Sequence, residues 1–288
     1  MIEVCFKAPK NKKDFSSIEI ALASYGILPT EFVYKEPVRG KKQLCVYFEN
    51  KKVLKNVKVF FRAKGLSGWI AGTRDLEKKD WLTKWQSDYR MGPLGKKFTI
   101  VPLWQKDRFK GSSIPVYMDP QGSFGSGTHE TTRLVVQTME KLEGRFKDFL
   151  DIGTGTGVLM VVASHLGVTR NHGYDLDPQA VATATVNLKH NHIHNARVRV
   201  EDVLKDRSPK KYDLVAANLL SKTLVDSRQR LAACVTKGGY LIVSGIERRN
   251  LPWFLIKFKV SSLKRLKTTQ SKSWASVLYH KPFYTPGV

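Results

Sequence analysis

The 288-residue sequence is poor in cysteine, in acidic residues and in long apolar runs. Its three cysteines, Cys5, Cys45 and Cys234, are odd in number, widely spaced and form no CxxC pair, so they predict neither a disulfide framework nor a zinc ribbon. The longest purely apolar run, residues 158–163, is far shorter than the ~20 residues that a bilayer requires. The first residues alternate apolar side chains with lysine and lack the apolar core of a leader peptide. We therefore expect a cytoplasmic protein in a reducing compartment.

The shortage of acidic residues leaves a strong positive balance. The chain has 49 Lys+Arg against 25 Asp+Glu, a formal net charge of +24. Residues 1–100 carry +11, 101–150 carry +1, 151–245 carry +4 and 246–288 carry +8. The excess therefore lies at the two ends, where an acidic partner is favoured. With 42% hydrophobic and 26% charged residues, and with no repeat or low-complexity tract, the chain is typical of a globular protein.

The length suggests two domains. Residues 1–75 predict a small α+β domain, and residues 76–118 predict a linker and connecting segment that contains the turn-rich stretch 91–95. Residues 119–288 predict the second domain. In the first domain the expected elements are strands at 2–7, 32–35, 44–48 and, by alternation, 57–62, with an amphipathic helix at 16–25.

The second domain alternates strand and helix. Strands are expected at 148–152, 172–176, 198–200, 214–217 and 240–244, and helices at 158–166, 178–189 and 219–234. This alternation predicts an α/β fold with a doubly wound, mainly parallel sheet. Ligands bind such sheets outside the carboxyl ends of the strands, so the residues that end each strand are the informative ones.

The first of these strands runs into a glycine-rich turn at residues 151–157. Gly153 and Gly155 allow positive φ and a close approach of the backbone to a ligand. Val158 stands where a dinucleotide fingerprint has its third glycine, which favours a nucleoside beside the turn over a pyrophosphate. A purely structural tight turn is the alternative.

Three further strand ends carry polar side chains. Asp175 follows Gly153 by 22 residues, the spacing at which a carboxylate meets ribose hydroxyls, while Asp177 is better placed to cap the helix that begins at Pro178. Residues 201–202, Glu-Asp, could accept a hydrogen bond from an adenine amino group or could be solvated. Asn218 offers an acceptor to an amine or a cap to a helix.

Other polar segments have weaker signals. The glycine-rich stretch 124–132 predicts either a loop that folds over a site or an ordinary connector. His190, His192 and His194 lack the partners of a metal site, so we expect none. The lysine runs at 10–13 and 41–42, with tryptophans nearby, favour either a solvated face or RNA contact.

Taken together, these motifs resemble the PrmA family, the methyltransferases of large-subunit ribosomal protein eleven. The resemblance runs from about residue 80 to the end of the chain. It rests on residues 80–81, Trp85, Gly95, 100–104, 119–120, 124–132, 151–157, 175–179, 218–221 and Trp274.

The resemblance implies a class I methyltransferase domain that uses S-adenosylmethionine, preceded by a ferredoxin-like domain that presents a ribosomal protein. The residues that it places at the cofactor are Phe124, Thr128, Thr132, Gly153, Gly155, Asp175 and Asn218. Asn218 would also orient the substrate amine, with His129 as a candidate base. The expected products are methylated lysine side chains or a methylated N-terminal amine.

The sequence departs from the family pattern at two places. Residues 122–123 are Gly-Ser in place of Leu-Ala, and the second helix of a ferredoxin-like domain finds little room between Phe48 and Val57, which predicts a shortened domain. The alternatives are the same chemistry on another protein or on ribosomal RNA, or a non-catalytic ribosome-binding or RNA-binding relative. We expect ribosomal RNA contact through the basic first domain.

Overall fold

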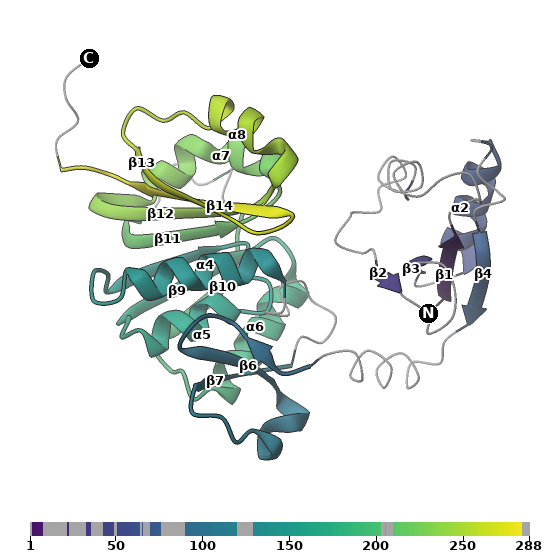
Figure 1. Ribbon diagram of the computed structural model, residues 1–288, viewed down its shortest axis with the longest axis horizontal. Coiled ribbons are helices and arrows are strands. Elements are labelled where there is room, and N and C mark those ends of the chain that lie inside the picture. The colour runs from purple at the N-terminus through teal and green to yellow at the C-terminus, as the bar shows by residue number, and fades with distance from the viewer. Residues whose placement is uncertain are drawn as a thin grey trace. The chain divides into compact units, whose positions relative to one another are not determined.

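The chain forms two compact units, Met1–Tyr89 and Arg90–Val288 (Figure 1). The computed structural model describes residues 2–7, 22, 33–35, 43–48, 51–63, 65, 70–75, 90–119, 129–202, 205 and 210–283. Most of the helix expected at 16–25, the loop residues Phe124 and Thr128, and the lysine and tryptophan segments at 10–13, 41–42, 81 and 85 lie outside these residues.

The first unit contains a four-stranded antiparallel sheet. Its strands are β1 (Ile2–Lys7), β2 (Val33–Lys35), β3 (Gln43–Phe48) and β4 (Ile70–Asp75), in the order β2-β3-β1-β4. This order is that of a ferredoxin-like sheet.

One predicted element of this unit is wrong. Residues 57–62 are not a strand but part of helix α2 (Lys51–Ala63), so the second helix is present and the unit is not shortened. Val57 and Phe61, one helical turn apart, are fully buried, whereas Lys58 and Val59 are exposed. The Phe61 ring stacks on Phe6 of β1 at a centroid distance of 5.2 Å, which fixes the helix on the sheet.

The cysteine prediction is also corrected. Cys5 and Cys45 lie directly opposite each other in the register of β1 and β3 and are disulfide-bonded. Forty residues separate them in sequence, and only the pairing of the two strands brings them together. Cys234 is buried in the second unit.

The second unit is built on a seven-stranded sheet in the order β10-β9-β8-β11-β12-β14-β13. The parallel strands are β8 (Asp148–Ile152), β9 (Arg170–Asp175), β10 (Ala196–Val200), β11 (Tyr212–Asn218) and β12 (Val235–Glu247). Strands β14 (Trp274–His280) and β13 (Lys264–Gln270) are antiparallel and complete one edge. The predicted mainly parallel, doubly wound fold is confirmed.

Helices cover both faces of this sheet (Figure 1). On one face lie α4 (Glu130–Lys141), α5 (Val158–His165) and α6 (Pro178–His190), and on the other lie α7 (Ser221–Ala233) and α8 (Leu251–Lys257). The core under α7 and α8 is apolar and includes Val215, Ala217, Leu224, Val243 and Phe254. No helix among the described residues combines the length and apolarity that crossing a membrane requires.

The second unit begins earlier than residue 119. Residues 90–118, expected as part of a connecting segment, form β5 (Gly92–Pro93), β6 (Phe98–Pro102), a 3-10 helix (Leu103–Arg108) and β7 (Ile114–Met118). The Glu140 carboxylate of α4 accepts hydrogen bonds from the backbone N–H groups of Lys96 at 2.8 Å and Lys97 at 2.7 Å. These contacts attach the small β5-β6-β7 sheet to helix α4 of the same unit.

Candidate active site

The candidate site lies where β8, β9 and β11 end. Strand β8 pairs with β9 on one side and with β11 on the other. The turn after β8 therefore lies between Asp175, the last residue of β9, and Asn218, the last residue of β11. The three motifs that the sequence singles out meet at one edge of the sheet, as expected for a parallel sheet.

The glycine-rich turn requires its glycines for two reasons. Gly153 and Gly155 have φ of 75° and 53°, a region that disfavours side chains. A Cβ atom on Gly153 would also lie 2.4 Å from Cδ2 of Leu219. The N–H groups of Gly153 and Thr154 both donate to the Tyr174 carbonyl, at 2.7 and 3.0 Å, and hold the turn against β9.

The Asp175 carboxylate is positioned by the backbone around it. Its Oδ2 accepts from the Gly155 N–H at 2.8 Å, and its Oδ1 accepts from the Asp177 N–H at 3.0 Å. Each carboxylate oxygen has a second lone pair, so the group keeps acceptor capacity for two hydroxyls. Asp177 caps α6 by accepting from the Gln179 N–H at 2.9 Å, as predicted.

The hydroxyl of Thr131 joins the two predicted catalytic residues. The Asn218 amide Nδ2 donates to Thr131 Oγ1 at 3.2 Å, and this Oγ1 lies 2.7 Å from His129 Nδ1. The Thr131 N–H also donates to His129 Nδ1, at 3.3 Å. Because Nδ1 is an acceptor in this arrangement, the Thr131 hydroxyl donates a hydrogen bond to His129 and accepts one from the Asn218 amide.

His129 is therefore a neutral ring with its proton on Nε2. Burial is the main cause that lowers the pKa of His129; Glu130 raises it, and Arg133 adds to the lowering. The ring packs edge-on against Trp274 of β14 at a centroid distance of 5.0 Å. Since the basic nitrogen already accepts from Thr131, His129 is a cap of α4 and a support for Thr131 rather than a well-placed proton acceptor.

Two buried polar atoms at the site have no hydrogen-bond partner among the described residues. They are Thr132 Oγ1 and Asp151 Oδ1. The other carboxylate oxygen of Asp151 accepts from the Thr154 hydroxyl at 2.8 Å. Burial raises the pKa of Asp151 to about 7, against an opposing contribution from Thr154, and the neighbouring Asp175 raises it further. A buried carboxylate with one unpaired oxygen, beside a second carboxylate, is suited to a cationic ligand.

Apolar side chains are exposed at the same edge of the sheet. Leu176 follows β9, Val200 ends β10 and Leu220 precedes α7, with exposed fractions of 67%, 54% and 46%. Val200 is in register with Asp175. Exposed apolar surface next to a hydrogen-bonding carboxylate suits a nucleoside, whose base is flat and whose ribose carries hydroxyls.

The structure thus brings together Thr132, Gly153, Gly155, Asp175 and Asn218, with His129 at the start of α4. The Gly155 N–H donates to the Asp175 carboxylate, so this glycine helps to position that side chain. The backbone N–H of Glu201 donates to the Asp175 carbonyl at 2.9 Å, which places residues 201–202 beside β9.

Sequence reasoning missed Thr131 and the unpaired oxygen of Asp151.

No set of three or more His, Cys, Asp and Glu side chains suited to a metal occurs among the described residues.

Fold and site define a class I methyltransferase that uses S-adenosylmethionine. The unpaired oxygens of Thr132 and Asp151, the oriented Asp175 and the exposed apolar side chains fit a cationic nucleoside cofactor. A family model described as "Ribosomal protein L11 methyltransferase (PrmA)" matches residues 17–282. The chain belongs to this family.

Relatives and a solved structure agree with this membership. The chain is 36% identical over 204 residues to the Geobacter metallireducens ribosomal protein L11 methyltransferase, covering 71% of this chain and 67% of that one. It is 30% identical over 206 residues to the Alkaliphilus oremlandii protein of the same name, covering 72% and 66%. The crystal structure of a ribosomal protein L11 methylase from Lactobacillus delbrueckii subsp. bulgaricus aligns with a TM-score of 0.62 at 25% identity, over 67% of this chain and all of that chain.

Proposed function

We propose that this protein transfers methyl groups from S-adenosylmethionine to amines of a large-subunit ribosomal protein, at lysine side chains, the N-terminal amine or both, in the cytoplasm. The target comes from the names of the relatives. The observation that supports amine chemistry most directly is the orientation of Asn218. Its Nδ2 donates to Thr131, which fixes the orientation of the amide, and its Oδ1 is the acceptor that it would offer to a substrate amine.

Described side chains would supply the contacts to the cofactor. Asp175 would accept from the ribose hydroxyls, and Leu176 and Val200 would flank the adenine. Asp151 and Thr132 would use their unpaired oxygens toward its polar end. When bound, the cofactor supplies an electrophilic methyl group on a positively charged sulfur. The task of the protein is to align amine, methyl and sulfur and to exclude water.

The substrate amine must be neutral to attack. The Asn218 Oδ1 would accept one N–H of the amine and leave its lone pair directed at the methyl group. The reference pKa of lysine is ~10.4, and loss of hydration beside a cationic cofactor lowers it. We propose that the proton leaves to water before transfer, because the acceptor nitrogen of His129 is occupied by Thr131. This replaces the interpretation of His129 as the base.

Labelled S-adenosylmethionine and purified ribosomal proteins test this function. The wild-type protein should label one large-subunit protein, and mass spectrometry should locate the methyl groups on amines. Asn218→Ala should lower kcat about 100-fold, the cost of a misaligned substrate. Thr131→Val keeps the shape but removes the bridging hydroxyl, and should lower kcat about tenfold with unchanged cofactor affinity.

Three outcomes would count against the proposal. Tight cofactor binding with no labelled ribosomal protein would reject the target. Label that survives protease treatment but not ribonuclease would move the target to RNA. Full activity of Asn218→Ala would remove the assigned role of its amide.

Ribosomal RNA contact through the first unit is part of this proposal. Helix α2 contains no acidic residue, and its Lys55, Lys58 and Arg62 are exposed. A helix with exposed positive charge suits phosphate contacts, which position a protein without reading sequence.

A further inference from the structure

A second basic surface lies on one face of β9 and β10, and it reaches the residues directly before Asp175 and Val200. Along β9, Asn171 and Gly173 face α5: the Asn171 amide donates to the Met160 carbonyl at 2.7 Å, and a Cβ atom on Gly173 would meet Met160 Sδ. Because side chains alternate along a strand, Arg170, His172 and Tyr174 face the opposite side.

Strand β10 continues this surface. Arg197 pairs with His172 and Arg199 with Tyr174 in the parallel register, so both arginines share the face of their partners. Both are exposed, whereas His172 and Tyr174 are half-buried. Alternate positions on a strand are about 6.7 Å apart and neighbouring strands about 4.8 Å, so the five side chains form a flat array. We call Arg170, His172, Tyr174, Arg197 and Arg199 the β9–β10 face.

No described helix covers the β9–β10 face. Helices α7 and α8, which lie on this side of the sheet, pack on β11 and β12. The connection from β10 to β11 is described at residues 201–202, 205 and 210–211, and none of these residues is helical. Doubly wound sheets are normally covered on both faces, so a face that no described helix covers needs an explanation.

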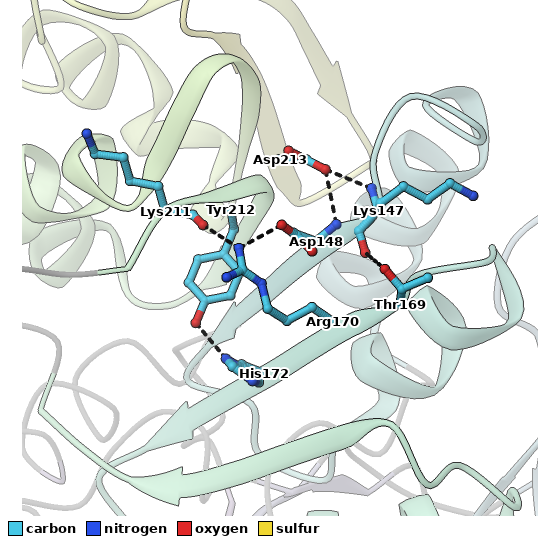
Figure 2. A network of polar contacts seen from close by, with 8 residues as sticks. All are labelled: Lys147, Asp148, Thr169, Arg170, His172, Lys211, Tyr212 and Asp213. Carbon is cyan, nitrogen blue, oxygen red and sulfur yellow. Dashed lines mark hydrogen bonds and ion pairs between the residues drawn. The ribbon is translucent and has the colours of Figure 1, made fainter.

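Two side chains of this face, Arg170 and His172, are held in place (Figure 2). The Arg170 guanidinium donates to Asp148 Oδ2 at 2.7 Å and to the Lys211 carbonyl at 2.7 Å, and it lies over the Tyr212 ring at 4.8 Å. His172 Nδ1 lies 2.6 Å from the Tyr212 hydroxyl. The centre of the face is therefore ordered before any partner binds, which reduces the entropy cost of binding.

The charge of the face is mainly positive, with the Glu201 carboxylate near Tyr174. Burial lowers the pKa of His172, and four cations around it add to the lowering; these are Arg170, Lys210, Arg197 and Arg199. Among the described residues, Arg197 and Arg199 form no ion pair. Asp148 is paired with Arg170, and Asp213 accepts from the backbone N–H groups of residues 147–148.

We infer that the β9–β10 face binds single-stranded RNA, with the arginines on phosphates and the half-exposed rings of His172 and Tyr174 against bases. Sheet faces that combine cations with aromatic rings are a common platform for unpaired RNA. An acidic peptide would use the charges but has no bases to stack on the rings. This site is separate from the basic helix α2 and does not depend on the methyl-transfer function.

Charge removal at two matched places on the sheet tests the site. Arg197→Gln with Arg199→Gln changes the β9–β10 face, and Lys264→Gln with Lys267→Gln removes two exposed charges from β13 at the other edge. Binding of a fluorescent unstructured RNA is followed by anisotropy from 0.1 to 1 M salt. Cofactor affinity, measured by calorimetry, reports whether each variant is folded.

Removing two phosphate contacts should lower the steepness of log affinity against log salt by about 1.4. The loss of RNA affinity should therefore be about 25-fold larger in 0.1 M salt than in 1 M salt. The β13 pair should change the slope by less than half as much. Equal losses in the two pairs would overturn the inference, since they would report only net charge. So would an unchanged slope in the arginine variant, or an equal loss of affinity for polyglutamate.

Discussion

The buried carboxyl group of Asp151, one oxygen of which is unpaired, should couple cofactor binding to the release of a proton. With a pKa of about 7, it is about 90% protonated at pH 6, about 50% at pH 7 and about 10% at pH 8. A cation bound beside it favours the ionised form. Cofactor binding should therefore release about 0.9 proton at pH 6, about 0.5 at pH 7 and about 0.1 at pH 8.

Calorimetry in two buffers with different ionisation heats measures this release. Asp151→Asn should abolish it while leaving the carboxamide to bond Thr154. Asp177→Asn is the matched control, because it removes a carboxylate from the same edge yet still caps α6. If the Asp151 variant released as many protons as the wild-type protein, or if the wild-type protein released none at pH 6 to 7, the reasoning would be refuted.

The Asp151 carboxyl group also makes the stability of the fold depend on pH. Its ordinary pKa of 3.8 is raised to about 7 by folding, so the folded protein holds a proton that the unfolded chain releases between those values. The cofactor-free protein should therefore lose stability as the pH rises from about 4 to about 7. Asp151→Asn should flatten this part of the profile in urea unfolding.

Two further substitutions test the backbone and ribose contacts. Gly245→Ala should lower the free energy of unfolding in urea by about 2 to 5 kcal/mol, because Gly245 has a φ of +85° and a Cβ atom there would lie 2.2 Å from the Leu219 carbonyl oxygen. Gly144→Ala is the control: with a φ of +78° and no atom within 4 Å, it should lower that free energy by about 1 to 2 kcal/mol. Equal costs would show that the contact is relieved without strain. Asp175→Ala should weaken cofactor binding by about 1 to 3 kcal/mol in calorimetry, and an unchanged affinity would remove its role at the ribose.

The sequence predicted the second unit better than the first for a physical reason. Strands buried in a parallel sheet are short apolar runs, as at residues 148–152. Glycine and proline mark the ends of the elements around them, as Pro178 does at the start of α6. In α2, Val57, Lys58 and Val59 alternate apolar and charged side chains, which also fits a strand with one exposed face. The helical period shows only in burial, where positions 57 and 61 are inside and 58 and 59 are outside.

Single residues at strand ends can be located from the sequence, whereas an arrangement of several residues cannot. Asp175 and Asn218 stand at strand ends, which a pattern can locate. The role of Thr131 depends on a hydrogen bond to a residue 87 positions later, and the unpaired oxygen of Asp151 depends on complete burial. Neither leaves a local signal in the sequence. The Cys5–Cys45 pair is hidden in the same way by strand register.

The buried amide of Asn187 has a consequence for residues 120–128. It accepts from the Asp119 N–H at 2.8 Å and donates to the Thr156 carbonyl at 3.0 Å, which ties the start of that segment to the glycine-rich turn. At the other end, Thr131 ties α4 to Asn218. Both ends are fixed by bonds that do not involve the nine residues between them. A substitution of Asn187 would therefore act on the cofactor edge from a distance, because this one amide holds both Asp119 and the carbonyl of Thr156 in the glycine-rich turn.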